Sequence, residues 1–313
     1  MSESEIYIHN SPQKEFIRKK WIEYANLIHS KTDEFGILTF PAKEMQDLYL
    51  FKEEGFIDRE EVETKASDGT YNLKITKGKV RCFEKDINIQ NYLRTKLTQA
   101  KVEGDISAYL RTNYGSITSK KDKTFPVDVV NLDFDKRLQP NTKYPFDETI
   151  EYIFKFQKNY TKNFSLFLTW PSTETEDIEE YKNLLVSTIN ANLTDPSASN
   201  FTSSFLKSIG SIDKLDYEKK SVIGISKIVI KKASQNLYVL NKNEFFVYGG
   251  ESKDRKRMIS LLFSFKYDGN TGTENTIYSQ NVANALSRII DINDEDKEQL
   301  LLNFQATHKP KHK

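Results

Sequence analysis

The side chains best suited to chemistry in this 313-residue sequence are short polar groups that directly follow apolar runs. Residues 127–130, Val-Asp-Val-Val, lead straight into Asn131, Asp133 and Asp135. A largely apolar run of this length predicts a strand that is buried on both faces of a parallel sheet. Open α/β folds bind ligands at the carboxyl ends of such strands, so we expect these polar groups to line a crevice. A solvated turn after a buried strand is the alternative interpretation.

Two kinds of chemistry suit carboxylates gathered at one edge of a sheet. They accept hydrogen bonds from ligand hydroxyls and amines, or they bind Mg²⁺, for which Asp128, Asp133, Asp135 and Glu84 are the candidates. A metal nuclease also needs a nearby lysine on a strand, and Lys136 does not follow that pattern, so the metal site is the weaker hypothesis.

Signatures of several other enzyme classes are missing from the sequence. It has no Walker A loop, no His-Glu-x-x-His and no Gly-x-Ser-x-Gly. Its histidines lie near the termini, at His9, His29, His308 and His312, which argues against a histidine-based catalytic centre.

Composition bounds the class of protein. The net charge of +1 gives no global attraction to nucleic acids. The single cysteine, Cys82, excludes an internal disulfide and a multi-cysteine zinc site. No apolar stretch approaches the roughly 18 residues of a membrane span, and the first ten residues lack a signal core. We therefore expect a cytoplasmic protein with no membrane segment.

Hydrophobic periodicity predicts an alternation of strands and helices up to about residue 170, followed by an antiparallel hairpin. The predicted strands are 36–41, 80–84, 127–135, 164–170, 236–248 and 256–267, with a small hairpin insertion within 58–79. Residues 102–110 are predicted to form a further short strand, a turn and the start of a helix. The predicted helices are 12–30, 42–54, 87–98, 144–156, 174–193, 201–209, 217–234 and 281–290. This order indicates an α/β fold with a mostly parallel sheet and an antiparallel edge.

The order of elements resembles that of the class I S-adenosylmethionine-dependent methyltransferases. The resemblance implies a Rossmann-like, doubly wound, seven-stranded sheet whose last two strands form an antiparallel hairpin. It divides the chain into an N-terminal helical segment (1–34), a methyltransferase-like α/β domain (35–270) and a C-terminal helix with a basic tail (271–313).

The resemblance also implies a cofactor site for S-adenosylmethionine. Thr39 and Pro41 would lie against the methionine part of the cofactor, Glu84 would bind the ribose hydroxyls, and Asp105 of Gly104-Asp105 would reach the adenine amine. The loop after Thr39 departs from the family because it has no glycine, and a tight turn fixed by Pro41 is an equal alternative. A surface turn is the alternative at Asp105.

The catalytic segment of amino-methyltransferases, Asp/Asn-Pro-Pro-aromatic, resembles Asn131-Leu132-Asp133-Phe134 with both prolines replaced. The resemblance implies catalytic roles for Asn131, Asp133 and Phe134, with a flipped nucleic-acid base as a plausible guest. A second register, Asp133-Phe134-Asp135, is closer to the Asp-Pro-Phe-Gly of some RNA methyltransferases, and both registers stay open. Trp170, after the next strand, either stacks on a substrate or packs in the core.

Two functions follow. The first is a methyltransferase acting on a nucleic-acid base of DNA or RNA, or on a similar amine. The second is a catalytically inactive relative that serves as an interaction subunit with a protein partner in a larger assembly. Local basic groups, at Lys120, Lys121 and Lys123 and at Lys253, Arg255, Lys256 and Arg257, would hold phosphates if they flank the crevice.

Overall fold

The computed structural model describes eleven segments of the chain: residues 12–29, 34–41, 45–65, 71–98, 100–134, 146–172, 183, 185–190, 211–249, 257–269 and 290–292. The predicted helix at 201–209 and the basic tail lie outside these residues. So do most of the predicted helices at 174–193 and 281–290, and Asp135. No helix within the described segments is long and apolar enough to cross a membrane.

An eight-stranded sheet with the order β11-β9-β10-β8-β7-β1-β4-β6 forms the centre of the molecule. Its strands are β1 (Gly36–Thr39), β4 (Lys79–Phe83), β6 (Lys101–Glu103), β7 (Val129–Asp133), β8 (Phe164–Pro171), β9 (Tyr238–Tyr248), β10 (Met258–Tyr267) and β11 (Ile290–Ile292). Only β10 runs against its neighbours, β8 and β9. The Rossmann-like fold and its C-terminal hairpin are confirmed. The short β11, parallel to β9, is an eighth strand where seven were predicted.

A smaller sheet contains the predicted hairpin insertion. It consists of β2 (Asp58–Lys65), β3 (Tyr71–Lys77) and β5 (Leu97–Thr98). The predicted helix at 87–98 therefore ends earlier, because its last two residues form β5, which pairs with β3.

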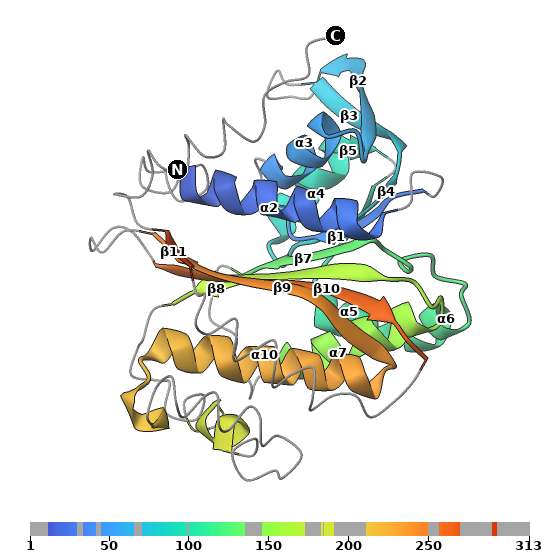
Figure 1. Ribbon diagram of the computed structural model, residues 1–313. Coiled ribbons are helices and arrows are strands. Elements are labelled where there is room, and N and C mark those ends of the chain that lie inside the picture. The colour runs from blue at the N-terminus through green and yellow to red at the C-terminus, as the bar shows by residue number, and fades with distance from the viewer. Residues whose placement is uncertain are drawn as a thin grey trace.

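Helices cover both faces of the main sheet (Figure 1). One face carries α2 (Pro12–Ile28), α3 (Gln46–Glu53) and α4 (Ile87–Lys96). The other carries α5 (Ile106–Thr112), α6 (Tyr114–Thr118), α7 (Phe146–Lys158) and α10 (Tyr217–Gln235). This is the doubly wound arrangement in which the strands are hidden from solvent, and accordingly β7 and β8 are buried along almost their whole length.

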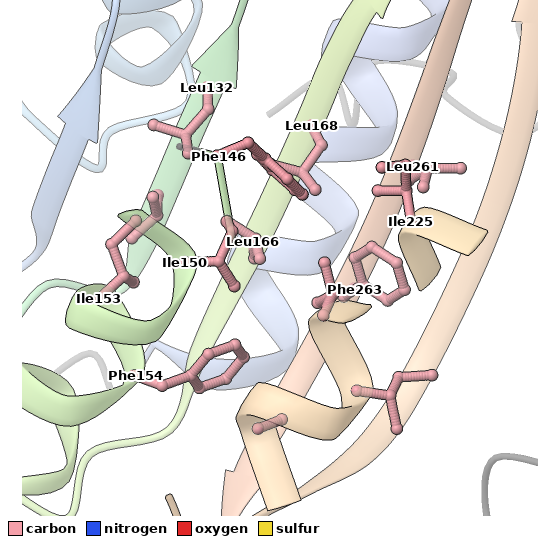
Figure 2. Packing of buried hydrophobic residues seen from close by; sticks show 14 of the residues in the cluster. Leu132, Phe146, Ile150, Ile153, Phe154, Leu166, Leu168, Ile225, Leu261 and Phe263 are labelled. Carbon is pink, nitrogen blue, oxygen red and sulfur yellow. The ribbon is translucent and has the colours of Figure 1, made fainter. Parts of the chain in front are cut away.

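The two faces of the sheet belong to two apolar cores. In the core seen in Figure 2, Ile150, Ile153 and Phe154 of α7 lie at helical spacing and pack on Leu166 of β8. On the opposite face, Trp21 of α2 stacks on Phe167 of β8, with ring centroids 5.7 Å apart. Consecutive residues of β8 thus serve opposite cores, which fixes the register of this strand.

Gly224 allows α10 to approach a neighbouring segment closely. A Cβ at this position would lie 2.4 Å from Leu185 Cδ2 and 3.3 Å from its Cα. Glycine in a helix interior normally costs up to about 1 kcal/mol relative to alanine, so its use here is a packing requirement.

We predict that Gly224→Ala lowers the free energy of unfolding by about 1–3 kcal/mol, because Leu185 must move to accept the methyl group. Gly115→Ala in α6 is the matched control, since a Cβ there meets nothing within 4 Å. The control should be neutral or slightly stabilising in urea titrations. Equal effects of the two substitutions would contradict the close approach.

Candidate functional site

The parallel strands bring the predicted site residues to one edge of the sheet, which we call the carboxyl edge. Thr39 lies beside both Cys82 of β4 and Asn131 of β7, and Phe83 lies beside Glu103 of β6. The residues that follow or end these strands therefore face the same side, and they include Thr39, Pro41, Glu84, Asp105, Asn131, Asp133 and Phe134.

Asn131 is the centre of a buried polar cluster. Its side chain is fully buried, and its Nδ2 donates to Asp47 Oδ2 at 2.8 Å and to Thr39 Oγ1 at 3.3 Å. Asp47, in the first turn of α3, also accepts from Arg18 Nε of α2 at 3.1 Å. The Asn131 Oδ1 atom is buried, and no described residue donates a hydrogen bond to it. The side-chain amide of Asn131 therefore forms internal hydrogen bonds and is not accessible to solvent.

Asp133, two residues after Asn131, is the last residue of β7, and its side chain faces the buried Lys14. Lys14 Nζ of α2 donates to Asp133 Oδ2, and the two side chains are 5% and 23% exposed. Lys14 also lies 5.5 Å from the centre of the Trp21 ring. Burial lowers the pKa of Lys14, but the neighbouring Asp133, Tyr248 and Asp47 together raise it by more, so the net direction is upward and Lys14 stays protonated. The other oxygen of Asp133, Oδ1, has no hydrogen-bond partner among the described residues.

Phe134 continues from β7 beside the first strand. Its backbone N–H donates to the Thr169 carbonyl at 2.8 Å, and its ring meets Phe40 edge to face at 5.3 Å. The ring is only partly buried. Phe134 therefore presents part of an aromatic side chain next to Asp133.

Glu84 and Asp105 follow β4 and β6. Glu84 Oε1 accepts from the Asp86 N–H at 2.8 Å, and its second oxygen has no partner in the described part of the chain. Asp105 caps α5 by accepting from the Ala108 N–H at 2.9 Å, and it pairs with Lys85 at 2.8 Å. Asp105 thus has a local structural role, whereas Glu84 keeps an acceptor atom available.

The loop between β1 and α3 lacks glycine but still contains a left-handed residue. Met45, which precedes α3, has φ 51° and ψ 28°, a conformation that favours glycine. Its side chain is buried in the core beneath α2, and Pro41 earlier in the loop is buried as well. Side chains therefore occupy space beside this loop that glycines would leave open.

The sequence analysis missed three members of the polar cluster: Lys14, Arg18 and Asp47. A signal was available, because Lys14, Ile17, Arg18 and Trp21 fall on one face of α2 at three- and four-residue spacing. The two cations were therefore on the apolar face of an amphipathic helix, where charges need buried partners.

Other predicted groups lie elsewhere. Trp170 is fully buried in the core below the sheet. Lys120, Lys121 and Lys123 precede β7 and so lie at the opposite edge of the sheet from Asp133, which means that they do not flank the crevice. Of the second basic group only Arg257 is described, and it pairs with Glu218. Within the described ranges, no three His, Cys, Asp or Glu side chains are grouped as a metal site would require.

No protein-family model and no curated protein matches the chain. Among solved structures, a crystal structure described as a "putative RNA methyltransferase" from Pyrococcus horikoshii is similar to this chain. The alignment covers 84% of this chain and 89% of the chain in that structure. The identity is 10% and the TM-score 0.39, so this similarity carries no functional argument. Strand order and direction identify the architecture on their own. The chain has an α/β, Rossmann-like fold.

We predict that Arg18→Met lowers the free energy of unfolding by about 3–5 kcal/mol near neutral pH, because Asp47 is left as an uncompensated buried charge. Burial already raises the pKa of Asp47 in the folded protein, against the pull of Arg18. Loss of Arg18 raises it further, so the folded state takes up a proton at higher pH than the unfolded state, whose carboxyl titrates near about 4.

The deficit of the variant should therefore shrink as the pH falls from about 7 towards about 5, measured by urea unfolding. Arg18→Met/Asp47→Asn should recover much of the loss, since asparagine removes the charge and keeps an acceptor for Asn131. A deficit that is independent of pH would contradict the assignment to Asp47.

Proposed function

We propose that this protein is a methyltransferase that uses S-adenosylmethionine and acts on an amine of a nucleic-acid base or a similar compound. The observation that carries the proposal is the pair of carboxylates at the carboxyl edge, Glu84 and Asp133, each with one oxygen that no described residue uses. They follow β4 and β7, the two strands that flank β1.

The residues of this edge suit the ribose part of the cofactor best. Glu84 offers a partly exposed carboxylate oxygen, and vicinal hydroxyls are good donors to such an acceptor. Asp105 is tied to α5 and Lys85, so a role at the adenine amine would use its remaining acceptor capacity. Thr39 is buried under Asn131, and Thr39 and Pro41 would contribute through the backbone of their loop.

The same geometry favours Asp133 over Asn131 as the group that contacts the target amine. Asn131 is fully buried and donates to Asp47, whereas Asp133 is partly exposed and keeps Oδ1 free. Oδ1 would accept a hydrogen bond from the amine and turn the nitrogen lone pair away from Asp133, towards the cofactor. S-adenosylmethionine, when bound, supplies an electrophilic methyl group. Lys14 would hold the carboxylate in place, and Phe134 would offer a ring for stacking.

We predict that the purified protein binds S-adenosylmethionine and S-adenosylhomocysteine with a dissociation constant in the micromolar range by isothermal titration calorimetry. Glu84→Gln should weaken both by about ten- to a hundredfold, because a charge-assisted hydrogen bond is worth about 1.5–3 kcal/mol. Glu53→Gln, at an exposed position of α3, is the charge-matched control and should bind like the wild type. A folded wild-type protein that gives no heat would rule out the cofactor site.

Methyl transfer to mixed-sequence oligonucleotides from a tritiated donor tests the role of Asp133. Asp133→Asn should lower kcat by about a hundredfold while cofactor affinity stays unchanged, since the amide is a weaker acceptor but still satisfies Lys14. The exposed Asp213→Asn should leave kcat unaltered. Full activity in Asp133→Asn would remove Asp133 from the reaction.

A non-catalytic interaction subunit is the second candidate, and the loop after β1 favours it. This loop has a buried Pro41 and a left-handed Met45 with a buried side chain where the family uses glycines. Both features restrict the close backbone approach that the methionine part of the cofactor needs. Calorimetry with the wild type separates the two candidates, because only the first requires cofactor binding.

A further inference from the structure

A second cluster of charges lies at the amino edge of the sheet, where the parallel strands begin. Lys79 begins β4 and Arg81 lies in the middle of this strand, and the loop that leads into β7 contributes Lys120, Lys121 and Lys123. Arg81 NH2 donates to the Lys123 carbonyl at 3.1 Å, so strand and loop are in contact. These five cations gather at one edge of a protein whose net charge is only +1.

Two cations of this edge donate to backbone carbonyls. Lys79 Nζ donates to the Pro126 carbonyl at 3.3 Å, and Arg81 NH1 donates to the Val80 carbonyl at 3.0 Å. Burial lowers the pKa of Lys79, as do the charges of Arg81 and Lys162, whereas those of Glu34 and Asp128 raise it. The five cations of this edge outnumber the neighbouring carboxylates, which are Glu34, Asp122 and Asp128.

The nearby carboxylates are already committed. Asp122 accepts from Lys101, Tyr109 and Thr124. Asp128 is fully buried and accepts from Lys162 Nζ at 3.0 Å and from the Gly36 N–H at 2.7 Å. Glu34 is an exposed carboxylate whose charge acts on both Lys79 and Arg81, and it offsets only part of their charge.

Aromatic rings accompany these cations. Lys120 Nζ lies 4.8 Å from the centre of the Tyr160 ring, and Lys155 Nζ lies 4.9 Å from that of Tyr114. Tyr114, on the helix α6 that leads to Lys120, is 37% exposed. Tyr160 is partly buried against the core. Proteins bind single-stranded nucleic acids with aromatic rings beside cations, because phosphates pair with the cations and bases stack on the accessible rings.

We propose that this amino-edge surface binds single-stranded nucleic acid without sequence preference. The surface is formed by Lys79, Arg81, Lys120, Lys123, Tyr114 and Tyr160. It lies on the opposite edge from Glu84 and Asp133, so it is a site distinct from the carboxyl edge. It does not depend on the proposed methyl transfer: a protein without cofactor binding would still use it.

Fluorescence anisotropy with a labelled 15-nucleotide oligo(dT) or oligo(U) probe and the full chain tests the proposal. The wild type should bind with an affinity that falls steeply with salt. Lys120→Gln/Lys123→Gln should weaken binding at low salt by at least about tenfold and reduce the log–log salt slope by about 1 to 1.5. Lys52→Gln/Lys214→Gln removes two equally exposed charges elsewhere and should leave binding unchanged.

Tyr114→Leu separates a nucleic acid from any other polyanion. The loss of stacking should weaken oligonucleotide binding about fivefold or more, while Tyr49→Leu, at an exposed ring on α3, should not. The proposal is overturned if the wild type does not bind, if both lysine double variants lose affinity equally, or if polyglutamate competes as well as oligonucleotide and Tyr114→Leu has no effect. Melting temperatures of all variants exclude unfolding as the cause.

Discussion

The pairing of two buried cations with the buried Asp47 and the partly exposed Asp133 connects the N-terminal helix to the centre of the structure. Lys14 and Arg18 enter the protein from one face of α2 and meet Asp133 and Asp47. A charge removed from water costs several kcal/mol unless a partner is in place, so each pair demands that α2, α3 and β7 keep their relative positions. The cluster therefore connects the N-terminal helix to the strand that ends at the candidate site.

This constraint shapes the chemistry of the carboxyl edge. In the cluster that fixes β7, the side chain of Asn131 donates to Asp47. Asp133 accepts from Lys14 through Oδ2, and no described residue donates to its Oδ1. A carboxylate that accepts from a buried ammonium is held in one position, which suits the proposed role of Asp133 as an acceptor for a substrate amine. The opposite edge has cations in excess and aromatic rings beside them. The two edges of one sheet thus differ in chemistry: the carboxyl edge presents carboxylate acceptors, and the amino edge presents cations.

Much of the fold could be predicted because strands buried on both faces are apolar runs and helices on them show helical spacing. The runs at 127–130 and 164–170 illustrate this, and both lie in the centre of the sheet. The position of Glu84 and Asp133 at a common edge followed from strand direction alone. The partners of Lys14 and Asp47 could not be predicted from the sequence, because the residues next to each of them do not specify which distant side chain it contacts in the fold. The place of Lys120 and Lys123 depends on which end of β7 they adjoin, and they precede this strand, at the end opposite the crevice.

Amide hydrogen exchange with and without S-adenosylhomocysteine tests the central claim, that an adenosyl cofactor lies over the carboxyl edge. The account predicts slower exchange in peptides that contain residues 39–45 and 84–90, with no change in peptides 119–126 and 79–82. Protection at residues 119–126, or no protection anywhere at saturating ligand, would contradict it.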